Sequence, residues 1–177
     1  TQDTAGNFIG NPSAGGISGM STDSFGLYAN SGANPFVNAG RGLSNALSIG
    51  QTLSFQWGVN FNAGAKGFNL FSGGTQIINL NLGGGSNNIT VNGVSVLPDY
   101  GTISFYVGIT RTDASTYTVF STSSRTNGTL GGFSTTVSSS LAADNFTLYV
   151  SGTSSGNEQQ PYFNNFSVTA VPEPSTY

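Results

Sequence analysis

The strongest constraint on the fold is an alternation of apolar and polar residues with a period of two. Between Ile103 and Thr110, the residues Ile, Phe, Val and Ile alternate with Ser, Tyr, Gly and Thr. Because successive side chains of a β-strand point to opposite faces, this pattern predicts a strand with one face in a core. The same alternation recurs at Phe25–Ala29, Leu53–Trp57, Ile78–Leu82 and Phe146–Val150. The chain is therefore predicted to consist mainly of half-buried strands.

Residues that favour turns separate these segments. Asn92-Gly93 lies between Ile89-Thr90-Val91 and Val94-Ser95-Val96, which is the clearest signal for a two-residue hairpin. Only residues 138–144 could form a helical turn, and that segment is too short to be stable alone. We therefore expect an all-β fold, an antiparallel β-sandwich or jelly roll of ten or more short strands with no significant helix.

The 177 residues are expected to form one domain with extensions at both ends. Residues 21–170 carry the strand pattern and are assigned to the sandwich. Residues 1–20 are rich in glycine and form either a leading strand or an arm that pairs with a neighbouring subunit. Residues 171–177 are expected to be an extended tail, since Pro172 and Pro174 cannot donate to a β-ladder.

Composition excludes several classes of function. The chain contains no Cys and no His, which removes thiol chemistry, histidine acid–base catalysis and the usual zinc and haem sites. With four basic residues and a net charge of −3, the chain lacks the basic surface that binding of nucleic acid requires. No apolar run reaches the length of a membrane span. We expect no cofactor, with a single structural calcium ion left open.

The acidic residues do not form a recognisable catalytic pair. Jelly-roll glycosidases need two carboxylates that converge across a cleft, and no two acids here lie within one predicted strand at that spacing. Asp99 and Asp113 fall in predicted turns, and Glu173 lies in the tail. We therefore predict that the protein is not an enzyme, with a hydrolase as the least favoured alternative. No metal site is expected, and the weak candidates for calcium ligation are Asp23 and Asp144, supported by backbone carbonyls.

A few side chains are candidates for surface contacts. Tyr106 and Tyr149 have the opposite parity to their apolar neighbours and are predicted to face outward, toward a glycan or a subunit. Arg41 is either such a contact or, as the favoured interpretation, a donor that binds loop carbonyls or pairs with Asp23. Lys66, the only lysine, is predicted to be solvated in a loop.

The tail resembles a known sorting signal. Its residues match the opening of the PEP-CTERM signal of exported bacterial proteins, and they are Val171, Pro172, Glu173, Pro174, Ser175 and Thr176. In that family a hydrophobic helix and a basic cluster follow, and an exosortase processes the signal. Both later parts are absent here, so we expect a chain truncated after the Pro-Glu-Pro motif, by processing or because the ordered part stops at Tyr177. The resemblance implies secretion to the bacterial surface or matrix, and Thr1 is expected to follow a removed export segment.

The body of the chain also looks like the bodies of many PEP-CTERM proteins. The matching segments are Ser24–Gly32, Ala39–Arg41, Ala46–Phe55 and Tyr162–Thr169. Those bodies resemble concanavalin-like jelly rolls, and most have no assigned activity. The resemblance therefore implies a fold and a location and leaves the molecular function open.

From these features we expect a non-enzymatic structural protein of the bacterial surface or biofilm matrix. Its strand-rich body carries little of the charge that blocks pairing between sheet edges, which suits self-association into a fibre by strand addition. The expected partner is therefore a second copy of the chain. The alternative is a lectin-like module that holds extracellular polysaccharide, because uncharged Asn, Ser, Thr and Tyr surfaces suit sugars.

Overall fold

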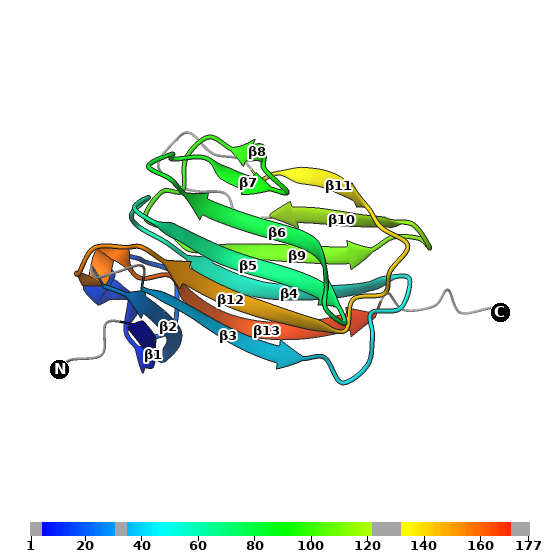
Figure 1. Cartoon of the computed structure of the whole chain (residues 1–177), viewed down its shortest axis with the longest axis horizontal. Helices are drawn as coiled ribbons and strands as arrows, with labels where there is room; N and C mark the ends of the chain where they lie inside the picture. Colours follow the sequence, from blue (N-terminus) through cyan, green and yellow to red (C-terminus); the bar gives the residue numbers. More distant parts are fainter. Residues whose placement is uncertain (1–4, 31–34, 122–131, 171–177) are drawn as a thin grey trace.

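The computed structural model describes residues 5–30, 35–121 and 132–170, which form two antiparallel β-sheets packed face to face (Figure 1). The predicted all-β sandwich is confirmed. Within the described ranges there is no α-helix, and the only helical turns are the 3₁₀ segments η1 (Pro12–Gly15) and η2 (Asn157–Gln159). The part of the chain that is described contains no helix long and apolar enough to cross a membrane.

The larger sheet has seven strands in the order β1-β2-β13-β4-β9-β10-β11. Its strands are β1 (Ala5–Gly10), β2 (Ser24–Ala29), β13 (Tyr162–Ala170), β4 (Gln51–Gly58), β9 (Phe105–Arg111), β10 (Thr116–Ser121) and β11 (Ser134–Ser138). All neighbouring pairs are antiparallel. The C-terminal strand β13 therefore lies between the N-terminal strand β2 and the central β4.

The smaller sheet has six strands in the order β3-β12-β5-β6-β7-β8. Its strands are β3 (Phe36–Gly42), β12 (Asn145–Ser151), β5 (Ala65–Ser72), β6 (Thr75–Gly83), β7 (Ile89–Val91) and β8 (Val94–Leu97). The β7–β8 connection confirms the predicted hairpin. Asn92 and Gly93 both take positive φ values, 47° and 81°, as a two-residue turn that matches strand twist requires.

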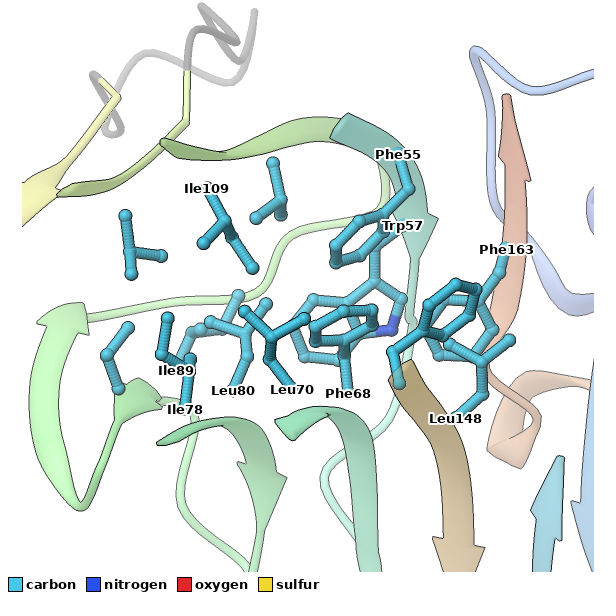
Figure 2. Packing of buried hydrophobic residues seen from close by; sticks show 14 of the residues in the cluster. Phe55, Trp57, Phe68, Leu70, Ile78, Leu80, Ile89, Ile109, Leu148 and Phe163 are labelled. Atoms are coloured by element: carbon cyan, nitrogen blue, oxygen red, sulfur yellow. The ribbon is translucent and has the colours of Figure 1, made fainter. Parts of the chain in front are cut away.

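The core lies between the sheets and is built by the alternating apolar residues of both (Figure 2). Phe55 of β4 stacks on Phe68 of β5 with ring centroids 4.5 Å apart, which joins the two sheets. Trp57, predicted to be in the core, is fully buried and lies parallel to Phe163 at 6.1 Å. Burial of each such side chain contributes about 1.5–3 kcal/mol, so the sandwich is held together without disulfides.

The N-terminal region is part of the same unit. Strand β1 pairs with β2 over six residues, from Ala5 opposite Ala29 to Gly10 opposite Ser24. Residues 11–22, here called the N-terminal wall, then cross the outer face of the seven-stranded sheet. Ile17 is 2% exposed, and its side chain and that of Met20 pack directly against Gly58, where a Cβ atom would lie 2.6 Å from the Met20 sulfur.

Lys66 corrects a prediction, because it lies in β5 and not in a solvated loop. Its side chain shares the inward direction of Phe68 and Leu70 and is fully buried. The amine donates hydrogen bonds to the backbone oxygens of Phe61 at 2.8 Å and Gln159 at 2.7 Å. Burial lowers the pKa of the Lys66 amine to about 7, although the negative charge of Glu158 opposes that shift.

Candidate functional site

The candidate site is a row of polar side chains on the outer face of the seven-stranded sheet. Gln56 lies on β4, directly opposite Tyr106 of β9 on one side and Asn164 of β13 on the other. All three have the opposite parity to the core residues Phe55, Phe105 and Phe163. Adjacent strands therefore present three polar side chains side by side on the face that points away from the core.

A β-bulge in β13 adds a fourth side chain to this row. The register between β13 and β4 shifts between Asn164 and Ser167, and Asn165 takes a left-handed conformation with φ of 54°. Asn tolerates this conformation better than most residues. The Asn165 amide nitrogen then donates to Gln56 Oε1 at 3.1 Å and to the Tyr106 phenol oxygen at 3.2 Å. We call Gln56, Tyr106 and Asn165 the amide–phenol cluster.

The orientation of Gln56 is fixed from both ends of its amide. Its nitrogen donates to Ser104 Oγ at 2.8 Å and to the backbone oxygen of Gly19 in the N-terminal wall. Its oxygen accepts the hydrogen bond from Asn165. Gln56 is only 5% exposed because the wall covers it, whereas Tyr106 is 45% exposed. The cluster therefore combines a rigid, covered amide with a phenol that solvent or a ligand can reach.

The amide–phenol cluster contains no charged side chain. Among the described residues, Lys66 is enclosed in the core and Arg111 Nη1 donates to the backbone oxygen of Leu47, away from the cluster. The cluster offers neutral donors and the proton of a phenol, a combination that can transfer a proton and stabilise a developing negative charge.

Tyr149, the second predicted contact, lies on the outer face of the other sheet but is nearly enclosed there. Its ring covers Gly67, and only 8% of its surface is exposed. The phenol donates to Asn81 Oδ1 at 2.7 Å and accepts from the amide nitrogen of Asn79 at 2.9 Å. Burial raises the pKa of Tyr149 to about 12. Its role in a glycan or subunit contact stays a prediction.

Arg41 does not meet Asp23. It lies on β3 opposite Phe146 and lines an opening between the two sheets, together with Phe166. The larger pocket at this opening has a volume of about 310 Å³ and is mainly apolar. The structure therefore separates Arg41 from both Tyr106 and Tyr149, and its suggested contact role stays a prediction.

The weak calcium candidates do not come together. Both carboxylate oxygens of Asp144 accept from the backbone N–H of Gly73, at 2.9 and 3.2 Å, which stabilises the turn between β5 and β6. Asp23 is exposed beside the start of β2. No group of three or more acidic side chains that could share a metal ion occurs in the described part of the chain. The sorting motif, Val171 to Thr176, lies outside the described residues.

The fold is similar to that of two solved alginate lyases. One, from polysaccharide lyase family 7, is 15% identical, with a TM-score of 0.49 over 96% of this chain and 79% of the lyase. The other, from Corynebacterium sp., is 16% identical, with a TM-score of 0.50 over 95% of this chain and 78% of the lyase. No family model and no curated protein matches the sequence. At these identities the likeness shows the fold.

This finding corrects two expectations from the sequence, that the protein is a non-enzymatic structural protein and that it is not an enzyme, because the similar structure from Corynebacterium sp. is that of an alginate lyase. A physical reason accompanies the correction: β1, the strand that a fibre would donate to a neighbour, is already paired with β2 of its own chain.

Tyr106 is a candidate contact from the sequence, whereas Gln56, Ser104 and Asn165 are not predicted by it. A signal for Gln56 existed, because it is the amide between the two core aromatic residues Phe55 and Trp57. Asn165 could not be placed by parity, since the bulge shifts the alternation by one residue at that point.

Proposed function

We propose that this protein is an enzyme that acts on a polysaccharide, with the amide–phenol cluster as its site. The observation that carries the proposal is the position of Tyr106, whose exposed phenol is held by Asn165 beside the fixed amide of Gln56. The likeness in fold to lyases that act on alginate supports the choice of substrate.

The residues favour elimination over hydrolysis. Hydrolysis of a glycosidic bond uses two carboxylates facing the bond, and the cluster contains none. Elimination needs a group that removes a proton from the carbon beside a sugar carboxylate and a proton for the departing oxygen. The C–O bond to the next sugar then breaks as a carbon–carbon double bond forms. We therefore assign a substrate with carboxylated sugars, such as alginate.

Each member of the amide–phenol cluster has a part in this reaction. Tyr106, as a phenolate, takes the proton from the carbon beside the carboxylate and then gives it to the departing oxygen, since its oxygen is within reach of a ligand on the sheet face. The Asn165 N–H donates to that oxygen and stabilises the negative charge that develops on it during proton transfer. Gln56 is a positioning residue, because its oxygen holds the Asn165 amide while its nitrogen is tied to Ser104 and Gly19.

The sorting-type motif adds a location to the proposal. Residues 171–176 resemble the opening of a signal for export to the bacterial surface or matrix, where an enzyme that cleaves acidic polysaccharide would meet its substrate. Detection of the protein in the secreted fraction, and its retention inside cells after deletion of residues 171–177, would support this location.

Incubation of the purified protein with a panel of acidic and neutral polysaccharides tests the activity. An unsaturated product, seen by ultraviolet absorbance and by a mass one water below that of a hydrolysis product, is the expected result. Tyr106→Phe should lower kcat by about 100-fold or more. Tyr149→Phe, which removes a phenol from the opposite sheet, is the matched control and should keep kcat unchanged. Equal activity of the wild type and Tyr106→Phe would contradict the assignment.

A further inference from the structure

A second group of aromatic residues lies on the same face as the amide–phenol cluster, at the edge formed by β1 and β2. Phe8, Tyr28, Asn30, Asn157 and Gln160 line an open pocket of about 310 Å³, here called the aromatic pocket. The Phe8 ring also contacts Tyr162 edge-to-face, with centroids 5.7 Å apart. The function proposed above does not use any of these residues.

Glycines beneath the rings let them lie close to the sheet. A Cβ atom on Gly26 would lie 2.3 Å from Cζ of Phe8, and one on Gly6 would lie 2.7 Å from the Tyr28 phenol oxygen. Each ring therefore occupies the space that a side chain on the facing strand would fill. The two rings are 6.2 Å apart and tilted by 50°, which forms a shallow aromatic surface.

The rim of the aromatic pocket consists of uncharged amides. Gln160 Oε1 accepts from the Tyr162 phenol at 2.9 Å, which fixes the Gln160 side chain. The side-chain nitrogens of Asn30, Asn157 and Gln160 make no hydrogen bond to any other described residue. The pocket therefore offers flat apolar rings together with unused N–H donors, the combination that suits the apolar face and the hydroxyl groups of a sugar ring.

The aromatic pocket is connected to the amide–phenol cluster through the strands between them. From β9, which carries Tyr106, the sheet continues through β4 and β13 to β2, which carries Tyr28. Three strand spacings correspond to roughly 14 Å, and the four-residue offset of Tyr28 along the strands adds roughly 13 Å at right angles to them. The two sites are therefore roughly 20 Å apart, a distance that a short run of sugars spans. The N-terminal wall lies over the sheet between the two sites, since Gly19 contacts Gln56 and Met20 contacts Gly58, so a bound chain would pass over the wall.

We propose that the aromatic pocket is a remote subsite that binds one sugar ring of the polysaccharide chain by stacking, while the chain extends to Tyr106. The inference rests on the proposed function for the identity of the ligand. It adds that affinity for the chain comes from aromatic and amide contacts at the β1–β2 edge, and that these contacts act on long chains only.

The test measures binding and turnover separately for long alginate and for short alginate fragments. Tyr28→Ala should weaken binding of the long chain by roughly 3- to 10-fold, the worth of one aromatic contact. Its kcat on short fragments should equal that of the wild type. Asn157→Ala, which removes an exposed rim amide, should weaken long-chain binding in the same direction without affecting the fold. The control is Phe36→Ala, which removes a 55% exposed ring from the other sheet and should change neither quantity.

The outcomes separate the subsite from the enzyme. If the wild type binds the polysaccharide without cleaving it, the enzymatic proposal fails, and weaker binding by Tyr28→Ala and Asn157→Ala still supports the subsite. If both variants bind long chains as tightly as the wild type, the subsite is overturned whatever the activity. Failure of the wild type to bind any polysaccharide also overturns it. Circular dichroism of each variant confirms that the sandwich is folded.

Discussion

The Lys66 amine donates a 2.7 Å hydrogen bond to the backbone oxygen of Gln159 and thereby connects the two sheets from inside the sandwich. Lys66 belongs to β5 of the six-stranded sheet, whereas Gln159 ends η2 and leads into β13 of the seven-stranded sheet. A second bond, to the oxygen of Phe61, holds the connection between β4 and β5. A titratable amine therefore joins the two sheets inside the core.

This arrangement predicts that stability rises with pH above neutrality. The pKa of Lys66 is about 7 in the folded protein and near 10.5 in the unfolded chain, so the unfolded state binds more protons between these values. The free energy of unfolding should increase by a few kcal/mol, on the order set by that difference, as pH rises from about 7 to 9.5. Urea unfolding at several pH values measures it, and Lys66→Met should remove most of the rise. A wild-type curve that is flat over this range would contradict the prediction.

The raised pKa of Tyr149 predicts that stability falls as pH rises above about 10. Its pKa is raised to about 12, above the value of about 10 for an unfolded tyrosine, so stability should fall as pH rises from about 10 to 12. Tyr149→Phe should reduce this loss. At neutral pH the same variant should cost about 1–3 kcal/mol, because Asn81 Oδ1 loses its donor. Thermal unfolding of both proteins at pH 7 and pH 11 tests the two effects together.

We expect position 67 to tolerate no residue larger than glycine. A Cβ atom at Gly67 would lie 1.9 Å from the backbone oxygen of Leu80 and 3.0 Å from the Tyr149 phenol oxygen. Gly67→Ala should therefore separate β5 from β6 and destabilise the protein by at least about 1–3 kcal/mol. Gly42→Ala is the matched control, since no atom lies within 4 Å of its Cβ position and the change should be nearly neutral. Similar unfolding midpoints for the two variants would contradict this account.

Asn165 allows the backbone and the amide of the bulge to be tested separately. Asn165→Gly keeps the left-handed conformation, so its stability should stay close to that of the wild type, while turnover falls because Tyr106 loses its donor. Asn165→Ala should lose turnover equally and also lose roughly 1 kcal/mol of stability from backbone strain. If Asn165→Gly keeps full turnover, the amide has no part in the reaction.

The fold could be predicted because its determinants are local. The alternation from Phe105 to Thr110 lies in β9, whereas Ile103, also expected in that strand, forms an isolated bridge with Ser18. The Asn92-Gly93 turn corresponds to the β7–β8 hairpin. Lys66 was misplaced because a charged residue near glycines was interpreted as a loop. Its parity with Phe68 and Leu70 was the better signal, since side chains that alternate along one strand share a face whatever their polarity.

The candidate site was less predictable because it depends on contacts between distant strands. Tyr106 could be assigned to an outer face from its own strand. The bonds from Asn165 to Gln56 and Tyr106 join residues 109 and 59 positions apart, and they require both the strand order and a bulge that parity does not reveal. Nor does the absence of His indicate that a protein is not an enzyme, since a phenol can carry a proton as well.

The lack of charge at the amide–phenol cluster and the aromatic pocket has a consequence for the medium in which the protein works. Proteins that hold acidic polymers by Lys and Arg lose affinity as ionic strength rises, because mobile ions screen the attraction. This chain has a net charge of −3 and uses amides and rings at its two proposed contacts, so dissolved salt would screen a repulsion instead. Its affinity for an acidic polysaccharide is therefore expected to stay the same, or to increase, at high salt concentration.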